Sequence, residues 1–149
     1  MALNLNAGQT RVLQGIKDLL NNNATSLKIP TVMFDELSTQ KDSICITTAP
    51  ESQLSERVAD VTGTAFRGEI HVSLTYRVMF DKSGNNDLKY IDLLDGVYQF
   101  LYNSYDTIGD ETFFIGDIRQ ERGALLDTVY QGGVKDFNLL FVVYYERSV

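Results

Sequence analysis

Two side chains could supply nucleophilic chemistry: Cys45 and His71, the single cysteine and the single histidine of the chain. A cysteine enzyme needs its thiol within hydrogen-bonding reach of a base, and the base must be oriented by a third group. Cys45 lies in the β-branched stretch SICITTA, where a small buried residue is the ordinary role. His71 lies on the polar side of an alternating stretch, a position typical of solvent or of an interface. We expect no catalytic residues, and a small Cys/His-dependent enzyme is kept as an alternative.

The spacing of residues does not indicate a metal site or a phosphate-binding site. One histidine and one cysteine do not make the ligand set of a zinc site. The carboxylates in FDEL and GDETFFIGD do not follow the pattern of a calcium loop. No glycine pattern typical of a phosphate-binding loop occurs. We therefore expect no metal and no cofactor.

Composition narrows the classes of partner. The chain has 149 residues and a net charge of −7, and its lysines and arginines are scattered singly. One domain of this length can bury a real core, and an acidic surface without a basic patch lets DNA pass without specific binding. A single cysteine suits a reducing compartment. No signal peptide opens the chain, and LLFVVYY is too short to span a bilayer as a helix, so we expect a cytoplasmic location during synthesis and no membrane partner.

The elements that must position any site follow from hydrophobic periodicity. Apolar residues repeat at helical spacing over 8–21, and NNN at 21–23 ends that helix. A second helix begins near Asp87 and presents Leu94, Tyr98 and Leu101 on one face. Strands are predicted in IPTVMFDEL, SICITTA, the stretch up to residue 81, TFFIGDIRQER with a bulge at Gly116, and KDFNLLFVVYYER. The order α-β-β-β-α-β-β predicts an α+β fold, with a mostly antiparallel or mixed central sheet and two main helices packed on one face.

The strand GEIHVSLTYRVMFD, residues 68–81, is the most distinctive feature. Its apolar face predicts packing of Leu74 and its neighbours against the second helix. Fourteen residues span roughly 45 Å, whereas a domain of this length is roughly 40 Å across, so the strand must bend or overhang the core. An overhanging edge invites a neighbouring subunit. The other face supplies the candidate subunit-interface residues, which are Glu69, His71, Ser73, Thr75, Arg77 and Met79.

Two segments do not follow a clear period. Residues 50–66 are polar, with Pro50 at the start and Gly63 near the end, and are predicted to form a mobile loop in the single domain 1–149. Residues 121–133 fit either a short strand or an ordered loop. The last strand pairing is therefore left open.

Several of these stretches together resemble a known family. IPTVMFDEL, DSICITT, FRGEIHVSLTYRVMF, YIDLLDGVYQFLYN and VKDFNLLFVVYYER are similar to the tail-terminator or minor capsid proteins of long-tailed bacteriophages. The resemblance implies a virion protein without enzymatic activity, made in the host cytoplasm. It implies a ring, usually a hexamer, that caps the tail tube and takes part in head–tail joining. The implied partners are other copies of the chain, the tail-tube protein and the head–tail connector protein.

A second function stays open beside the ring. A monomeric or dimeric adaptor could use the loop and the numerous tyrosines to hold one partner. The size of the oligomer separates the two possibilities.

Overall fold

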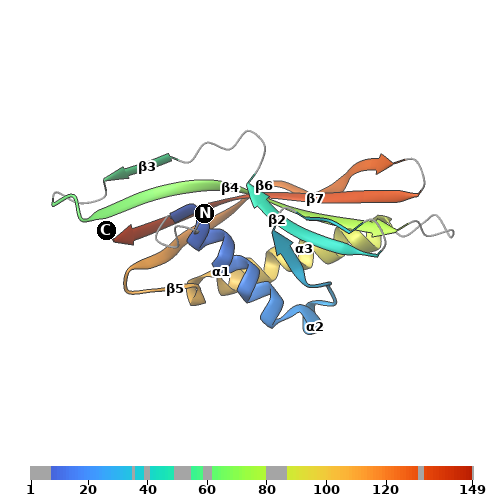
Figure 1. The fold of residues 1–149 in the computed structure, drawn as a ribbon, viewed down its shortest axis with the longest axis horizontal. Coiled ribbons are helices and arrows are strands. Elements are labelled where there is room, and N and C mark those ends of the chain that lie inside the picture. Colours follow the sequence, from blue (N-terminus) through green and yellow to red (C-terminus); the bar gives the residue numbers. More distant parts are fainter. Residues whose placement is uncertain are drawn as a thin grey trace.

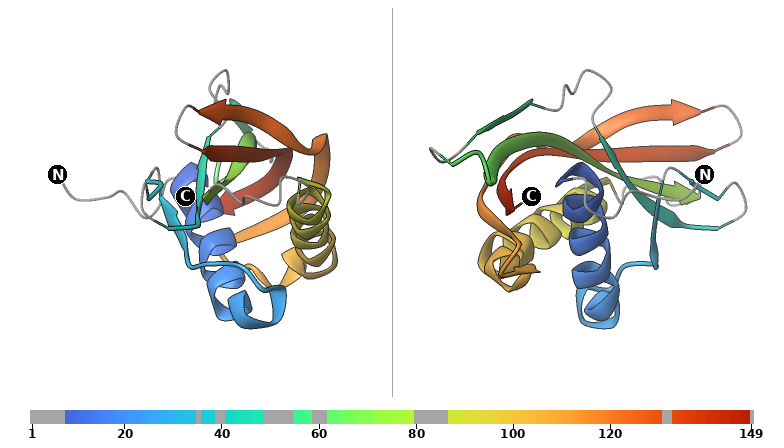
Figure 2. Two further views of the ribbon diagram at one scale, coloured as in Figure 1. Left: turned by 90° about the vertical axis from the view of Figure 1, so that its right-hand side faces the viewer. Right: turned by 60° about the vertical axis from the view of Figure 1, so that its left-hand side comes forward.

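The computed structural model describes residues 8–34, 36–38, 41–48, 55–58, 62–79, 87–130 and 133–148. They form a mixed, seven-stranded, curled sheet with two long helices on one of its faces (Figure 1, Figure 2). The predicted α+β class and order of elements are confirmed. The elements are α1 (Gly8–Asn22), α2 (Ala24–Leu27), β1 (Val32–Phe34), β2 (Ser43–Thr48), β3 (Ser55–Val58), β4 (Ala65–Met79), α3 (Asp87–Ser104), the 3-10 helix η1 (Tyr105–Thr107), β5 (Gly109–Asp110), β6 (Phe113–Tyr130) and β7 (Val134–Ser148).

The sheet has the strand order β1-β2-β4-β7-β6-β5, and β3 pairs with β4 outside this path. β1 runs parallel to β2, and the other pairs are antiparallel. β1 follows Pro30 and lies at the border of the sheet, where a residue without an amide hydrogen is tolerated. No helix in the described part of the chain is long and apolar enough to cross a bilayer.

Helix α1 forms because its apolar residues recur every four positions. Val12, Ile16 and Leu20 are all fully buried. Asn21 then joins the helix end to β1: its side chain accepts a 2.7 Å hydrogen bond from the Val32 amide and donates one of 3.2 Å to the Val32 carbonyl. The asparagine run thus ends the helix, as predicted, and also fixes the neighbouring strand.

Helix α3 buries Leu94, Val97 and Leu101. The expectation that this helix covers β4 is wrong in its main part, because α3 packs chiefly on β6 and β7, whereas α1 contacts β4 along with β7, β1 and β2. The Tyr98 ring, for example, lies 6.2 Å from the ring of Phe141 on β7. The strand order explains the difference, since β7 separates β4 from β6. An aromatic contact between Tyr76 and Tyr90, 5.7 Å between ring centroids, still joins β4 to α3.

Strand β4 has the alternation that the sequence predicts. From residue 70 to residue 78, its five even-numbered apolar side chains are no more than 5% exposed; they are Ile70, Val72, Leu74, Tyr76 and Val78. The strand pairs with β7 along its whole length, from Ala65 opposite Ser148 to Met79 opposite Val134. Its other edge is paired by β2 and β3. The sheet does extend past the helices (Figure 1), but β4 is covered within the chain and needs no neighbour for that purpose.

The predicted loop 50–66 contains a strand that sequence reasoning missed. β3 pairs with the beginning of β4, with Ser55 opposite Glu69 and Val58 opposite Phe66. Between them, Gly63 has a φ of 71°, a left-handed conformation that suits glycine. Residues 50–54 and 59–61 lie outside the described residues, and the mobility of the loop stays a prediction.

Strand β6 resolves the ambiguous stretch, because the described part of 121–133 continues the strand as far as Tyr130. Its pairing with β7 shifts register four times, and one shift, between Ile115 and Asp117, is the predicted bulge at Gly116. β5 pairs with Phe113 and Phe114. Beyond them, no described strand pairs with the far edge of β6.

Candidate subunit interface

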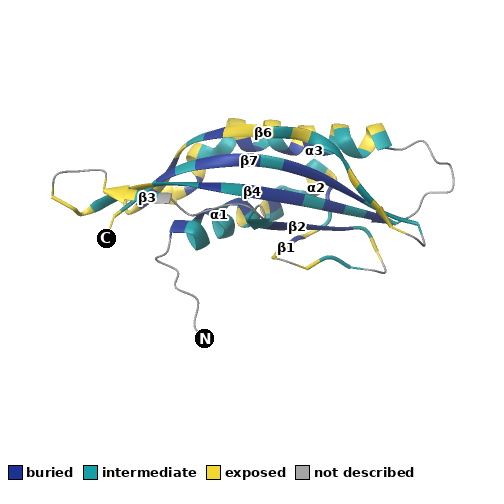
Figure 3. Ribbon diagram, turned by 90° about the horizontal axis from the view of Figure 1, so that it is seen from above, coloured by how far each residue is buried: buried dark blue, intermediate teal, exposed yellow. Residues whose placement is uncertain are grey.

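The face of the sheet opposite the helices is the candidate contact surface, and it holds the predicted row of β4. Figure 3 views the molecule from above and shows exposed residues on β3, at one end of the sheet, and on β6, along one border. Strand alternation places Glu69, His71, Thr75, Arg77 and Met79 on this face, all of them partly buried, together with Ser73, which is buried. That the row contacts a neighbouring subunit stays a prediction.

A buried polar layer lies at the middle of this face. The Asn138 side-chain amide donates hydrogen bonds to Ser73 Oγ at 2.6 Å and to Thr75 Oγ1 at 2.9 Å. Its oxygen accepts a 2.8 Å bond from Arg122. Both polar atoms of the Asn138 side chain therefore have hydrogen-bond partners, on β4 and on β6, the two strands beside β7. A buried amide without such partners would carry a desolvation cost. These interactions fix the position of the strands relative to one another within a single copy.

Arg77 forms a bidentate ion pair within the row. Its guanidinium donates to both carboxylate oxygens of Asp136, at 2.8 and 2.9 Å, and Asp136 is only 5% exposed. Tyr130 donates a 3.0 Å bond to the same carboxylate. Hydrogen bonding to Asp136 raises the pKa of Arg77. A bidentate pair of this kind is geometrically specific, so it holds the β6–β7 hairpin against β4.

The two residues with possible nucleophilic chemistry are not brought together. His71 Nδ1 lies 3.0 Å from a carboxylate oxygen of Glu121, which gives the imidazole an acidic partner. Cys45 is buried on β2 opposite Thr75, four strand positions from His71. Four positions correspond to roughly 13 Å along a strand, far beyond a hydrogen bond. Within the described residues, no group of three or more potential metal ligands gathers either.

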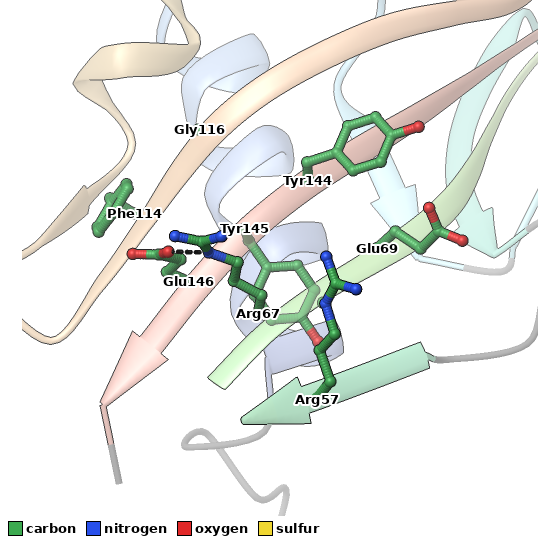
Figure 4. A pocket seen from close by; sticks show the side chains of 9 residues that line it. Arg57, Arg67, Glu69, Phe114, Gly116, Tyr144, Tyr145 and Glu146 are labelled. Carbon is green, nitrogen blue, oxygen red and sulfur yellow. Dashed lines mark hydrogen bonds and ion pairs between the residues drawn. The ribbon is translucent and has the colours of Figure 1, made fainter. Parts of the chain in front are cut away.

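At the β3 end, the same face is hollowed (Figure 4), and sequence reasoning missed this feature. The hollow has a volume of about 370 Å³ and is lined by charged and aromatic side chains, among them Arg57, Arg67, Glu69, Phe114, Tyr144 and Glu146. Arg57 on β3 stands directly opposite Arg67 on β4. Arg67 forms an ion pair with Glu146, whereas Arg57 forms none with another described residue.

The strand that carries Arg57 is anchored from the opposite face of the sheet. Glu56 accepts two hydrogen bonds from Arg147, at 2.7 and 2.9 Å, and one of 2.7 Å from the Tyr145 hydroxyl. The bonds from Arg147 lower the pKa of Glu56, and burial raises that of Tyr145. We call the group of Glu56, Tyr145 and Arg147 the β3 clamp. Successive side chains of a strand point to opposite faces of the sheet. Because Glu56 is bound on the face that the helices cover, Arg57 points to the open face.

Gly68 leaves room for the Tyr145 ring at the β3 end of the sheet. The Tyr145 ring packs across it, so that a Cβ on Gly68 would lie 2.5 Å from Tyr145 Cζ. Only a residue without a side chain leaves the ring in place to reach Glu56. The sequence carries one signal of the clamp, a glycine in an otherwise strongly β-forming stretch, which indicates close approach of another group.

Together these features define an α+β protein with one open, polar sheet face and a charged hollow at one end. A scan against models of protein families finds no match, and a search of curated proteins finds none. Among solved structures, the chain is similar to a chain of the structure titled "Virion of native gene transfer agent (GTA) particle". The TM-score is 0.61 at 12% identity, over 97% of this chain and 99% of that chain. At such an identity, the similarity shows a shared fold.

Proposed function

We propose that this chain is a structural protein of a phage-type virion, and within that class a tail terminator. It forms a ring on the end of the finished tail tube and joins the tail to the head. The observation that carries the proposal is the similarity to a chain of the gene transfer agent virion, which covers both chains almost completely. Such coverage compares two whole folds of similar length and not a shared motif. The sequence resemblance to tail terminators points in the same direction.

The proposed partners follow from that role. Copies of the chain contact one another in a ring, taken to be a hexamer from the family resemblance. One side of the ring binds the tail-tube protein and the other the head–tail connector protein, while DNA passes through without specific binding. The chain acts in the virion after synthesis in the host cytoplasm.

The two borders of the sheet support a ring. A head-to-tail ring requires two different surfaces on each copy, whereas a two-fold dimer uses one surface twice. β3 and β1 lie on one side of β4, and β6 lies on the other, beyond β7 (Figure 3). Each copy therefore offers two unlike borders to its neighbours.

The adaptor is the second candidate, and one observation favours it. Much of the polar row on β4 is occupied within the chain, by Asn138, Asp136 and Glu121. A face whose hydrogen bonds are satisfied internally can remain in solvent in a monomer. Sedimentation of the purified chain, alone and with tail tubes, separates the adaptor from the ring by mass. The Cys/His-dependent enzyme is the weakest candidate, because Cys45 and His71 lie far apart.

Deletion of the gene and electron microscopy of the resulting particles test the proposed function. Particles that lack the chain should accumulate as separate heads and tails, and addition of the purified protein should restore joined particles. Labelled protein should locate to the head-proximal end of the tail. Normal, joined particles without the chain would contradict the proposal.

A further inference from the structure

The hollow at the β3 end keeps two like charges side by side. Residues directly opposite in an antiparallel pair have Cβ atoms about 5 Å apart, so Arg57 and Arg67 repel each other. Glu146 neutralises Arg67. Arg57 is exposed, without a carboxylate partner among the described residues, beside the half-exposed Val58. The arrangement costs stability in the isolated chain and leaves one cation ready to receive an anion.

The hollow suits a protein carboxylate better than a nucleic acid. Glu69 and Glu146 line it beside the two arginines, so its formal charge balances. A run of phosphates would meet two carboxylates there and a net charge of −7 on the chain. A single carboxylate beside an aromatic or apolar side chain can instead reach Arg57 and contact Phe114, which is 47% exposed. These features describe a protein surface that presents an exposed carboxylate beside an aromatic side chain.

Such a surface exists on this same chain. The segment from Asp87 to Thr112 contains six carboxylates and one lysine, a net charge of −5 out of the −7 of the whole chain. Four of its carboxylates form no ion pair with another described residue; they are Asp92, Asp95, Asp106 and Glu111. All four are exposed, and Tyr102 in the same segment is 52% exposed. We call the exposed residues of this segment the acidic face.

We propose that the hollow at Arg57 receives the acidic face of a second copy of the chain. The inference rests on the proposed function, since it names the contact that joins neighbouring copies in the ring. Charge complementarity identifies the occupant, because Arg57 has no ion pair with another described residue and the acidic face carries exposed carboxylates that have none either. A two-fold contact at the hollow would place Arg57 against Arg57. In the proposed ring the contact is head-to-tail, so that each copy gives its hollow to one neighbour and its acidic face to the other.

The experiment measures self-association of the full-length chain by sedimentation velocity, alone and on purified tail tubes. Arg57→Glu should raise the dissociation constant between copies by about tenfold or more, as expected when an interface charge pair becomes repulsive. Lys41→Glu is the matched control: it changes the net charge by the same amount, is exposed, and lies near Ser43 at the opposite end of β4. It should leave association unchanged. Circular dichroism should show both variants folded, because both side chains are exposed.

Charge exchange then identifies the partner residue. Arg57→Glu is combined in turn with Asp92→Arg, Asp95→Arg, Asp106→Arg or Glu111→Arg. At least one combination should restore association, whereas the same acidic-face variant alone should weaken it. Failure of all four combinations, or equal weakening by Arg57→Glu and Lys41→Glu, would overturn the inference.

The two proposals fail in different ways. Rings that form normally from the Arg57→Glu variant would overturn the contact and leave the tail terminator standing. A wild-type chain that stays monomeric on tail tubes would overturn both.

Discussion

The Tyr145 hydroxyl donates a 2.7 Å hydrogen bond to Glu56 Oε2, and this bond joins the end of the chain to a strand about ninety residues earlier. Arg147 binds the same carboxylate through two further bonds. β3 has four residues and pairs only with the beginning of β4. The β3 clamp therefore supplies much of what holds Arg57 in place.

The first prediction concerns the clamp and pH. The pKa of Glu56 is lowered below its ordinary value of 4.5 in the folded chain. Its contribution to stability is therefore complete above about pH 4.5 and is lost as pH falls through the folded pKa. Glu56→Gln should lower the free energy of unfolding by about 1–2 kcal/mol at neutral pH and flatten its acid dependence. Denaturant titrations at several pH values measure both effects.

Hydrogen exchange adds a local readout of the same variant. Amides of β3 should exchange faster in Glu56→Gln, because the strand has few other contacts. Glu146→Gln is the control, since it removes an exposed ion pair with Arg67 and should cost less than about 1 kcal/mol. Equal effects of the two substitutions would mean that the clamp does not hold β3.

The second prediction compares two glycines. Gly68→Ala should destabilise the chain by about 1–3 kcal/mol, because a Cβ there would lie 2.5 Å from the Tyr145 ring, which is only 2% exposed. Gly96→Ala, on α3, meets no atom within 4 Å and should stabilise by about 0.4–1 kcal/mol. Thermal denaturation of both variants gives the signs. A melting temperature raised in both would show that the Tyr145 ring can move aside.

The third prediction concerns the core. Leu74 is fully buried, so Leu74→Ala should cost about 2–5 kcal/mol. Leu88→Ala removes the same atoms from a side chain that is 78% exposed, and should change stability by less than about 0.5 kcal/mol. Denaturant unfolding measures the difference. A loss below about 1 kcal/mol for Leu74→Ala would be inconsistent with its burial.

The fourth prediction separates assembly from chemistry. Cys45→Ser and His71→Ala should each leave self-association and particle joining intact. Cys45→Ser should show a modest loss of stability, since it places a hydroxyl at a buried position. Electron microscopy of particles complemented with each variant provides the measurement. A folded variant that abolishes function would revive the enzyme alternative.

The fifth prediction concerns DNA. The net charge of −7 and the scattered arginines should prevent tight binding of duplex DNA even at low salt, where phosphate contacts are strongest. Fluorescence anisotropy with a labelled duplex tests this, on the monomer and on assembled rings. Submicromolar binding at low ionic strength would contradict a conduit that lets DNA pass.

The sequence predicts helices and strands correctly where one hydrophobic period continues without interruption. Val12, Ile16 and Leu20 mark α1, and the alternation through Leu74 marks β4, because one buried face selects those residues. β3 has no apolar alternation; it pairs with β4, and its Glu56 is bound by Arg147, which is distant in sequence. No local pattern can indicate such a strand.

The candidate site was predictable only in part. The polar row on β4 follows from alternation alone. The hollow depends on the register that places Arg57 opposite Arg67. It also depends on Gly68, whose missing side chain leaves space for the Tyr145 ring. The ambiguity of β6 has a physical cause as well, since each register shift moves the following side chains to the other face and breaks the period.

Those register shifts also govern how the protein behaves at high concentration. A long, straight edge strand acts as a template, and identical copies can stack on it without limit into cross-β fibres. The pairing of β6 with β7 shifts register four times. Because the edge of β6 is irregular, a second β6 strand placed along it would keep matching hydrogen bonds for only a few residues. We therefore expect that fibre growth from this edge does not continue. We therefore expect the irregular strand to keep copies from aggregating along that edge even when many of them are present.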